Sequence, residues 1–242
     1  MKHIYFSGIG GAGIGPLALI AQQAGYTVTG SDKRDSDYIS YLKTHGVTDI
    51  AIEQSEKHIV TINKKTAIDW FVYSSAVEKE NTNNPELQYV KRNNIKHSKR
   101  DEFINHIIKE FTLELIAVAG THGKTTTTAM MIWLFKELGV SVSYSVGAKL
   151  SFGSMGEFNK DAKYFIYEAD EYDRNFLQFE PEIAIIPGID YDHPDIYPTR
   201  ESYYEAFVEF ITQSDEVIAH KEDAERIGMN AQVSAIEESD FT

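Results

Sequence analysis

The chain has 242 residues, of which 42% are hydrophobic and 25% are charged. This balance is typical of a folded globular protein, and the length suits two domains better than one. A net charge of −14 excludes extended binding of nucleic-acid phosphates, because such binding requires a clustered surplus of lysine and arginine. There is no cysteine, so disulfides, thiolate metal sites and cysteine nucleophiles are excluded as well.

The N-terminal sequence, MKHIYFSG, lacks the basic segment and the long apolar stretch of a secretory signal. No apolar run approaches the length of a membrane span. We therefore expect a cytoplasmic protein without membrane or nucleic-acid partners.

The first 110 residues alternate short β-rich segments with helical patterns. In chain order these are IYFSG, a helix over residues 16–24, YTVTGS, a helix near residues 38–44, WFVYSS, a strand at residues 95–97, and a helix that is capped by Asp101 and runs towards Phe111. Such alternation predicts parallel βαβ units. We expect a first domain over residues 1–110 with a Rossmann-like α/β fold.

A glycine-rich turn, GIGGAGIG, follows the first of these segments. It matches GxGxxG at Gly8, Gly10 and Gly13, and Asp32 ends the next strand. By itself this pattern indicates a dinucleotide site in which Asp32 binds a ribose, so an NAD-dependent oxidoreductase is one interpretation. Tight turns between a strand and a helix also require glycine where no ligand is bound, so the pattern alone is weak.

The alternation starts again after residue 110 and predicts a second α/β domain over residues 111–242. The apolar strand LELIAVAG leads through a glycine turn into a helix over residues 124–138, and the strands KYFIYEA, EIAIIPG and EVIAH follow. We expect a P-loop-type ATP-binding domain that is incomplete where this chain ends.

The glycine turn of the second domain has the chemistry of a phosphate-binding loop. Gly120 and Gly123 let backbone N–H groups surround phosphate oxygens, Lys124 neutralises the β and γ phosphates, and Thr125 is placed to bind Mg²⁺. The spacing departs from GxxxxGK[ST], because Val118 stands where the first glycine would be.

Two acidic segments follow strands of the second domain. Glu168, Asp170, Glu171 and Asp173 come after KYFIY, and Asp190, Asp192 and His193 come after EIAIIPGI. Parallel strands would bring both segments beside the phosphate loop, where carboxylate oxygens suit Mg²⁺ and histidine is a less usual ligand. Acidic loops are common in a chain of this charge, so Asp170, Glu171 and Asp173 are weaker candidates than Glu168.

The segment GTHGKTTTT resembles the ATP-binding loop of the Mur ligases. GIGGAGIGPLA, VTGSD, VYSSAV, HSKRDEF, YEADEYD and DYDHPD resemble further motifs of that family in the same order, along nearly the whole chain. The likeness is strongest to the alanine-adding branch. It implies ATP-dependent ligation of L-alanine to the carboxylate of UDP-N-acetylmuramate in peptidoglycan precursor synthesis, through an acyl phosphate and with Mg²⁺.

The resemblance also implies roles for individual residues. The ATP-binding residues are Gly120, Thr121, Gly123, Lys124, Thr125 and Thr126. The metal-binding residues are Thr125, Glu168 and His193, and the catalytic residues are Lys124, Glu168 and His193. The UDP-sugar-binding residues are Gly8, Gly10, Gly11, Gly13, Asp32, Ser74, Ser75, Ala76, Arg100 and His122. The family usually has a Thr-Asn pair where this sequence has Pro187 and Gly188, so an amide near the metal or the γ-phosphate is missing.

Family members continue with the rest of the central domain and with a C-terminal domain that brings the amino-acid site. We therefore expect this chain to be an incomplete portion that binds nucleotides poorly or partially and does not ligate alone. Three alternatives stay open: a murein-peptide ligase acting on the same UDP-sugar, an NAD-dependent oxidoreductase, and a non-catalytic nucleotide-binding module. Glycine or L-serine could also replace L-alanine as the acceptor, and the oligomeric state is left open.

Overall fold

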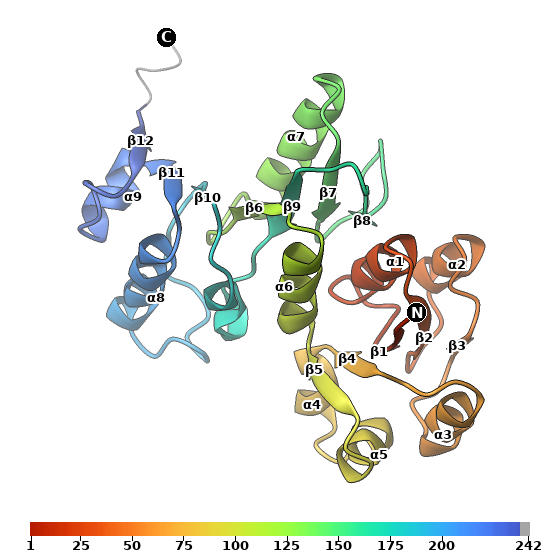
Figure 1. The fold of residues 1–242 in the computed structure, drawn as a ribbon. Helices are drawn as coiled ribbons and strands as arrows, with labels where there is room; N and C mark the ends of the chain where they lie inside the picture. The colour runs from red at the N-terminus through yellow and green to blue at the C-terminus, as the bar shows by residue number, and fades with distance from the viewer. Residues whose placement is uncertain (238–242) are drawn as a thin grey trace. The chain divides into compact units, whose positions relative to one another are not determined.

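A computed structural model of the chain describes residues 1–237, apart from the side chains of residues 79 and 80. The chain forms two compact units (Figure 1). The first contains residues 1–107 and 153–160, and the second contains residues 108–152 and the chain from residue 161 onwards. Both alternate strands with helices, so the predicted α/β class is confirmed. Within residues 1–237, no helix has both the length and the apolar character needed to cross a bilayer.

The first unit is a parallel sheet with connecting helices. Its main elements are β1 (His3–Ser7), α1 (Gly15–Gln23), β2 (Thr27–Ser31), α2 (Asp37–Thr44), β3 (Ile50–Ala51), α3 (Glu56–Lys65), β4 (Trp70–Tyr73), α4 (Ser75–Glu80), α5 (Pro85–Arg92), β5 (Lys96–Lys99) and α6 (Arg100–Glu110). The strand order is β3-β2-β1-β4-β5, and all four pairings are parallel. This is the order of a Rossmann-like half, in which the direction of strand addition reverses between β1 and β4.

The reversal point positions the first glycine turn. In sheets of this kind, ligands bind beyond the carboxyl ends of the strands where the order reverses. The glycine turn at residues 8–13 follows β1, and Ser74 follows β4. A Cβ atom on Gly8 would lie 3.4 Å from the Ser74 hydroxyl, so the two segments are in contact at the reversal point.

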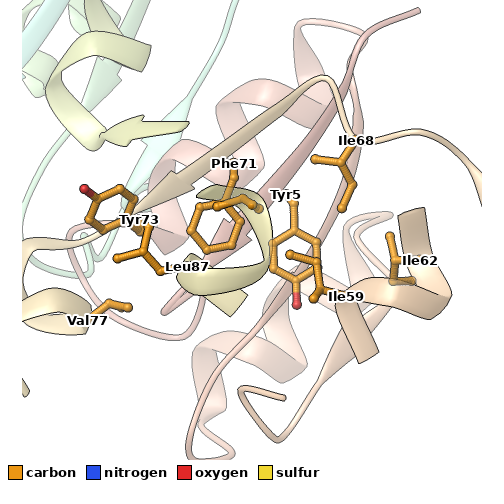
Figure 2. Close-up of a cluster of buried hydrophobic side chains, with 9 residues drawn as sticks. Tyr5, Ile59, Ile62, Ile68, Phe71, Tyr73, Val77 and Leu87 are labelled. Carbon is orange, nitrogen blue, oxygen red and sulfur yellow. The ribbon is translucent and has the colours of Figure 1, made fainter. Parts of the chain in front are cut away.

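A cluster of buried aromatic and aliphatic side chains packs helices α3 and α5 against the sheet (Figure 2). Tyr5 and Phe71 lie on the neighbouring strands β1 and β4, with ring centroids 5.5 Å apart and ring planes 12° apart. Ile59 and Ile62 come from α3, and Leu87 comes from α5. Burying a side chain of this size contributes about 1.5–3 kcal/mol, and this energy holds both helices on the sheet.

A buried carboxylate, Glu86, lies beside this cluster at the start of α5. It accepts hydrogen bonds from Tyr5 Oη at 2.6 Å, from Ser7 Oγ at 2.8 Å and from Ser31 Oγ at 2.7 Å. Burial raises the pKa of the Glu86 carboxyl, although the three hydroxyl donors oppose the change. Ser7 and Ser31 end β1 and β2, so Glu86 ties both strand ends to α5 just before the glycine turn and Asp32 begin.

The second unit is also a parallel sheet. Its elements are β6 (Glu114–Val118), α7 (Lys124–Glu137), β7 (Val142–Ser145), β9 (Tyr164–Glu168), the 3₁₀ segment η1 (Tyr172–Gln178), β10 (Ile183–Ile186), α8 (Arg200–Thr212), β11 (Glu216–His220), α9 (Lys221–Arg226) and β12 (Ser234–Ile236). The strands lie in the order β12-β11-β10-β6-β9-β7, and each of these neighbouring pairs is parallel. The segment after β6 is therefore flanked by the segments that follow β9 and β10.

Helix α7 is held on this sheet by side chains from three strands. Ile132 of α7 is fully buried in one cluster with Ile116 of β6, Ile166 of β9 and Tyr144 of β7. The outer face of the helix is apolar as well as exposed, with Met130, Trp133 and other large side chains in solvent. The packing fixes the start of α7, and with it the glycine turn, relative to the ends of β6 and β9.

Residues 153–160 belong to the first unit, whereas the predicted boundary at residue 110 places them in the second domain. They contain β8 (Gly156–Glu157), which packs against α1 so closely that a Cβ atom on Gly156 would lie 2.7 Å from the Pro16 carbonyl oxygen. Phe158 N also donates to Gln23 Oε1 at 2.7 Å. An excursion of this kind depends on tertiary contacts and leaves no signal in local periodicity.

The predicted cap of α6 is wrong. The helix begins at Arg100, so Asp101 lies within its first turn and does not precede it. The carboxylate is nevertheless close to the helix N-terminus, where negative charge is favourable.

Glu86 makes the stability of the first unit depend on pH. Its pKa is higher in the folded chain than in the unfolded chain, where a glutamate titrates near about 4.3. The stability that the protonated Glu86 carboxyl contributes is therefore fully present below the pKa of the unfolded chain. It is lost as the pH rises through the higher pKa of the folded chain. As the pH is raised from about 4.3 through the folded pKa, the thermal midpoint of the wild type should fall. The midpoint of Glu86→Gln should fall less, because this variant has no carboxyl to ionise. Calorimetric scans at a series of pH values would measure both.

The exposed Glu53→Gln variant is the matched control and should follow the wild type. A Glu86→Gln profile parallel to that of the wild type would contradict the role of the buried carboxyl.

Candidate functional site

The turn between β6 and α7 requires glycine at two positions. Gly120 has φ +145° and Gly123 has φ +79°, and Gly123 stands at the N-cap of α7 in the left-handed region. A Cβ atom on Gly120 would also lie 2.8 Å from the Gly188 carbonyl oxygen. The turn is therefore a close approach of two backbones, and it brings the N–H groups at the start of α7 to the carboxyl edge of the sheet.

Pro187 and Gly188, which follow β10, pack directly against this turn. Thr121 N donates to the Gly188 carbonyl at 2.9 Å, and a Cβ atom on Gly123 would lie 3.2 Å from Pro187 Cβ. Gly188 thus contributes a backbone acceptor and Pro187 an apolar ring.

Lys124 has two close acceptors from different segments, and the Thr121 carbonyl is a third at 3.5 Å. Its ammonium donates to the Gly120 carbonyl at 2.6 Å and to Glu171 Oε2 at 2.7 Å. The other oxygen of Glu171 lies 3.2 Å from His193 Nε2. Glu171, one of the weaker sequence candidates, is therefore the group that joins Lys124 to His193.

Glu171 is almost completely buried, with 1% of its side chain exposed, whereas Lys124 retains 16%. Burial raises the pKa of the Glu171 carboxyl, and the hydrogen bond and charge of Lys124 act in the opposite direction. A buried carboxylate is costly without a partner, so loss of either member of the pair would leave an uncompensated charge.

Thr125, at the start of α7, and Glu168, at the end of β9, are in direct contact. Thr125 Oγ1 donates to Glu168 Oε1 at 2.8 Å, and Gly147 N donates to Glu168 Oε2 at 2.8 Å. A hydroxyl and a carboxylate beside a phosphate loop suit Mg²⁺, which binds through few protein oxygens and completes its shell with phosphate and water. Among the described residues, no group of three or more His, Cys, Asp or Glu side chains is arranged to hold a metal ion. A cation at Thr125 and Glu168 would therefore need substrate oxygens.

The side-chain contacts of His193 are made with other residues than Thr125 and Glu168. Its backbone has φ +55°, its N–H donates to Asp192 Oδ1 at 2.7 Å, and its Nε2 faces Glu171. The edge of its ring also packs on Tyr172, with centroids 5.1 Å apart. Of the predicted metal set, Thr125 contacts Glu168, whereas His193 contacts Glu171, which is not part of that set.

Two buried tyrosines support the turn from outside. Tyr203 Oη and Thr121 Oγ1 lie 2.6 Å apart, and Thr121 Oγ1 also bonds the backbone of Asp190. Tyr197 Oη donates to the Glu171 carbonyl at 2.6 Å, and the Tyr197 and Tyr203 rings pack edge to face. Burial raises the pKa of both phenols, so both stay protonated and act as neutral donors. Sequence patterns missed both, because tyrosines between strands do not form a motif.

The remaining predicted residues of the second unit have less support. His122 and Thr126 are exposed. Asp170 caps the next turn by accepting from Tyr172 N at 3.1 Å, and Asp173 has φ +57° within η1.

In the first unit, several N–H groups of the glycine turn donate hydrogen bonds to acceptors at the end of β2. Gly8 N and Ile9 N both donate to the Ser31 carbonyl, and Gly10 N donates to Asp32 Oδ2 at 2.8 Å. Asp32 therefore closes the turn itself. Gly11 N donates back to the Gly8 carbonyl, so the first part of the turn is internally satisfied.

Arg100 reaches the second part of the same turn. A Cβ atom on Gly13 would lie 2.5 Å from a guanidinium nitrogen of Arg100. Glycine at this position leaves the space that the guanidinium occupies beside the N-terminus of α1. Ser74 precedes α4 without making a side-chain cap hydrogen bond, and Ser75 and Ala76 form the first turn of that helix. A guanidinium at a helix N-terminus is an arrangement that binds anions.

Comparison with known proteins assigns the chain to a family. Residues 3–112 match the model described as Mur ligase family, catalytic domain, and residues 118–238 match the model described as Mur ligase middle domain. The chain belongs to the Mur ligase family.

Two curated relatives of this Mur ligase chain are named UDP-N-acetylmuramate–L-alanine ligase. The one from Clostridium acetobutylicum is 36% identical over 97% of this chain and 50% of its own length. The one from Clostridium botulinum is 38% identical over 86% of this chain and 43% of its own length. The chain thus spans about half the length of the curated relatives that it matches.

Solved structures of related ligases have the same fold. The UDP-N-acetylmuramate-alanine ligase of Thermotoga maritima has a TM-score of 0.83 and 26% identity, and the match covers 98% of this chain and 53% of that one. A murein peptide ligase of Psychrobacter arcticus has a TM-score of 0.78 at 24% identity, over 94% of this chain and 51% of that one, which is evidence for the fold alone.

The hydroxyl of Tyr203 should stabilise the turn. Tyr203→Phe removes its hydrogen bond to Thr121 without changing the buried ring, so we expect the free energy of unfolding to fall by about 1 kcal/mol in urea denaturation. Tyr204→Phe changes a neighbouring, half-buried tyrosine and should have little effect. Equal effects of the two substitutions would exclude a specific role for the Tyr203 hydroxyl.

Proposed function

We propose that this chain is the UDP-sugar-binding and ATP-binding part of a ligase that joins L-alanine to the carboxylate of UDP-N-acetylmuramate. The observation that carries the proposal is the grouping of Lys124, Thr125 and Glu168 at the turn after β6. Membership of the Mur ligase family and the names of the relatives support the reaction class. The proposal places the enzyme in the cytoplasm, where ATP and nucleotide-activated sugars are available.

The chemistry requires activation of the carboxylate. A carboxylate oxygen of the sugar attacks the γ-phosphorus of ATP, and ADP leaves with the electrons of the broken P–O bond. The amine of L-alanine then attacks the acyl carbon, loses a proton and displaces inorganic phosphate. Both steps depend on positioning and charge neutralisation more than on a protein nucleophile.

The residues of the second unit suit these demands. The N–H groups at the start of α7 and the Lys124 ammonium are donors for phosphate oxygens. Thr125 and Glu168 would hold Mg²⁺, which neutralises charge on the transferred phosphoryl group. Gly120, Thr121, Gly123 and Thr126 would shape the same loop. His193 completes the proposed catalytic set with Lys124 and Glu168.

The first unit supplies the proposed UDP-sugar site. Arg100 beside the N-terminus of α1 is suited to the diphosphate. The family also implicates the whole glycine turn, Asp32 and the segment Ser74–Ala76. An oxidoreductase is less well supported, because Asp32 is engaged by Gly10 N and the second turn would have no function.

The acceptor is assigned from the relatives. Those 32–38% identical to this chain are named as L-alanine ligases, and this favours L-alanine over a peptide, glycine or L-serine. The murein peptide ligases share the fold at lower identity, so a peptide acceptor is the second candidate.

Nucleotide binding should depend on Lys124. We expect weak but saturable binding of ATP with Mg²⁺ by this chain in a calorimetric titration, and Lys124→Ala to weaken it by about tenfold or more, because a charge-assisted hydrogen bond is lost. The exposed Lys109→Ala variant is the control and should bind like the wild type. The assignment fails if Lys124→Ala binds as tightly as Lys109→Ala.

Binding of UDP-N-acetylmuramate should depend on Arg100. We expect Arg100→Ala to weaken the affinity by about tenfold and to reduce its dependence on salt, because one charge contact with the diphosphate is removed. Arg92→Ala removes an exposed arginine of the same unit and should leave the affinity unchanged. NAD binding in place of UDP-sugar binding would overturn the proposal for the first unit.

A further inference from the structure

Glu171 is the most buried acidic group around the turn, and the chemistry above gives it no role. We propose that Glu171 is a positioning residue of the nucleotide site. One of its oxygens directs the Lys124 ammonium towards phosphate, and the other fixes the His193 imidazole with Nε2–H inward and Nδ1 free for a cation. This inference rests on the proposed binding of ATP at the turn.

The contacts of Lys124 support the first claim, that Glu171 directs its ammonium. The ammonium makes short hydrogen bonds to the Gly120 carbonyl and to Glu171 Oε2, and the Thr121 carbonyl lies at 3.5 Å. Glu171 is the only one of these three acceptors that lies outside the turn, so it restricts the direction of the ammonium from a second segment. A lysine side chain is otherwise flexible, and fixing it beforehand lowers the entropy lost when a phosphate binds.

The contacts of His193 support the second claim, that Glu171 fixes its imidazole. Its Nε2 lies 3.2 Å from Glu171 Oε1, and an ionised carboxylate can only accept a hydrogen bond from the N–H at this position. The neutral ring is then protonated at Nε2, which leaves the lone pair on Nδ1. Histidines that bind metals commonly donate their other ring nitrogen to a carboxylate in this way. The T-shaped contact with the Tyr172 ring restricts the imidazole further.

Glu171 is itself firmly held. Its side chain is 1% exposed, and its carbonyl accepts the Tyr197 hydroxyl at 2.6 Å. Tyr197 packs on Tyr203, whose hydroxyl reaches Thr121 in the phosphate loop. The carboxylate and the loop therefore belong to one connected network, whereas the neighbouring carboxylate of Asp170 caps its own turn.

A nucleotide series separates positioning from general stability. Glu171→Ala, Glu171→Gln and the exposed control Glu180→Gln would be titrated with AMP, ADP and ATP in the presence of Mg²⁺. We expect Glu171→Ala to bind ADP and ATP at least tenfold more weakly and AMP within about twofold of the wild type, because Lys124 serves the outer phosphates. Glu171→Gln should stay within about threefold for ADP, since its amide oxygen still accepts from Lys124. A residue that only stabilised the fold would weaken all three nucleotides and lower the thermal midpoint together.

Nitrogen NMR of His193 provides a readout without nucleotide. In spectra of the neutral ring, the wild type should show the Nε2–H tautomer. In Glu171→Gln the amide donates to Nε2, so the tautomer should invert to Nδ1–H. This variant keeps the test decisive if Glu171→Ala does not fold.

The outcomes are distinguishable. If the wild type binds no adenine nucleotide, the proposed function fails and the inference fails with it. If the wild type binds and Glu171→Ala binds ADP equally well, or if His193 keeps one tautomer in the wild type and Glu171→Gln, the inference is overturned while the ATP site stands. If Glu171→Gln binds ADP as weakly as Glu171→Ala, charge and not direction is what matters, and the positioning role is rejected.

Discussion

The parallel arrangement of the strands is the constraint on which both units depend. β1 pairs in parallel with β2 and β4, and β6 pairs in parallel with β9 and β10. The carboxyl ends of these strands therefore gather at one edge of each sheet. Lys124, Glu171 and His193 follow three different strands, and only this arrangement brings them within hydrogen-bonding distance. The same constraint brings the Gly8 turn to Ser74 in the first unit.

Close approach of a neighbouring group is the second condition, and it explains why glycine is needed in both turns. Gly120 faces the Gly188 carbonyl, and Gly13 faces the Arg100 guanidinium. In the first case a side chain would push two strand ends apart. In the second it would displace the charged group suited to bind an anion. Gly188 also supplies a backbone acceptor to Thr121.

Glu86 in the first unit and Glu171 in the second are buried carboxylates near the strand ends, and the two are held in different ways. Glu86 accepts from the hydroxyls of Tyr5, Ser7 and Ser31, which are neutral donors. Glu171 is paired with the charged Lys124 and with an imidazole. Neutral donors favour a rigid structural joint, whereas a partly accessible cation is available to a ligand. Burial raises the pKa of both carboxyls, but only Glu171 lies beside groups with a proposed role in chemistry.

Much of the fold follows from local sequence. The alternation of apolar segments and helical patterns predicts α1, α2 and α7 to within a residue or two of their observed bounds, because periodicity and glycine turns are local properties. The excursion of residues 153–160 to the first unit and the true start of α6 at Arg100 are different. They depend on contacts with α1 and on the end of β5, which no short segment encodes.

The sequence by itself determined the family, the class of fold and the two turns, because glycine, lysine and threonine at fixed spacing already specify a phosphate loop. Only the tertiary structure decided which acidic residue reaches Lys124. Asp170, Glu171 and Asp173 lie within four positions of one another and have the same charge, so composition cannot rank them. The path of the backbone after β9, held by Tyr197, directs Glu171 inward and leaves Asp170 to cap its own turn.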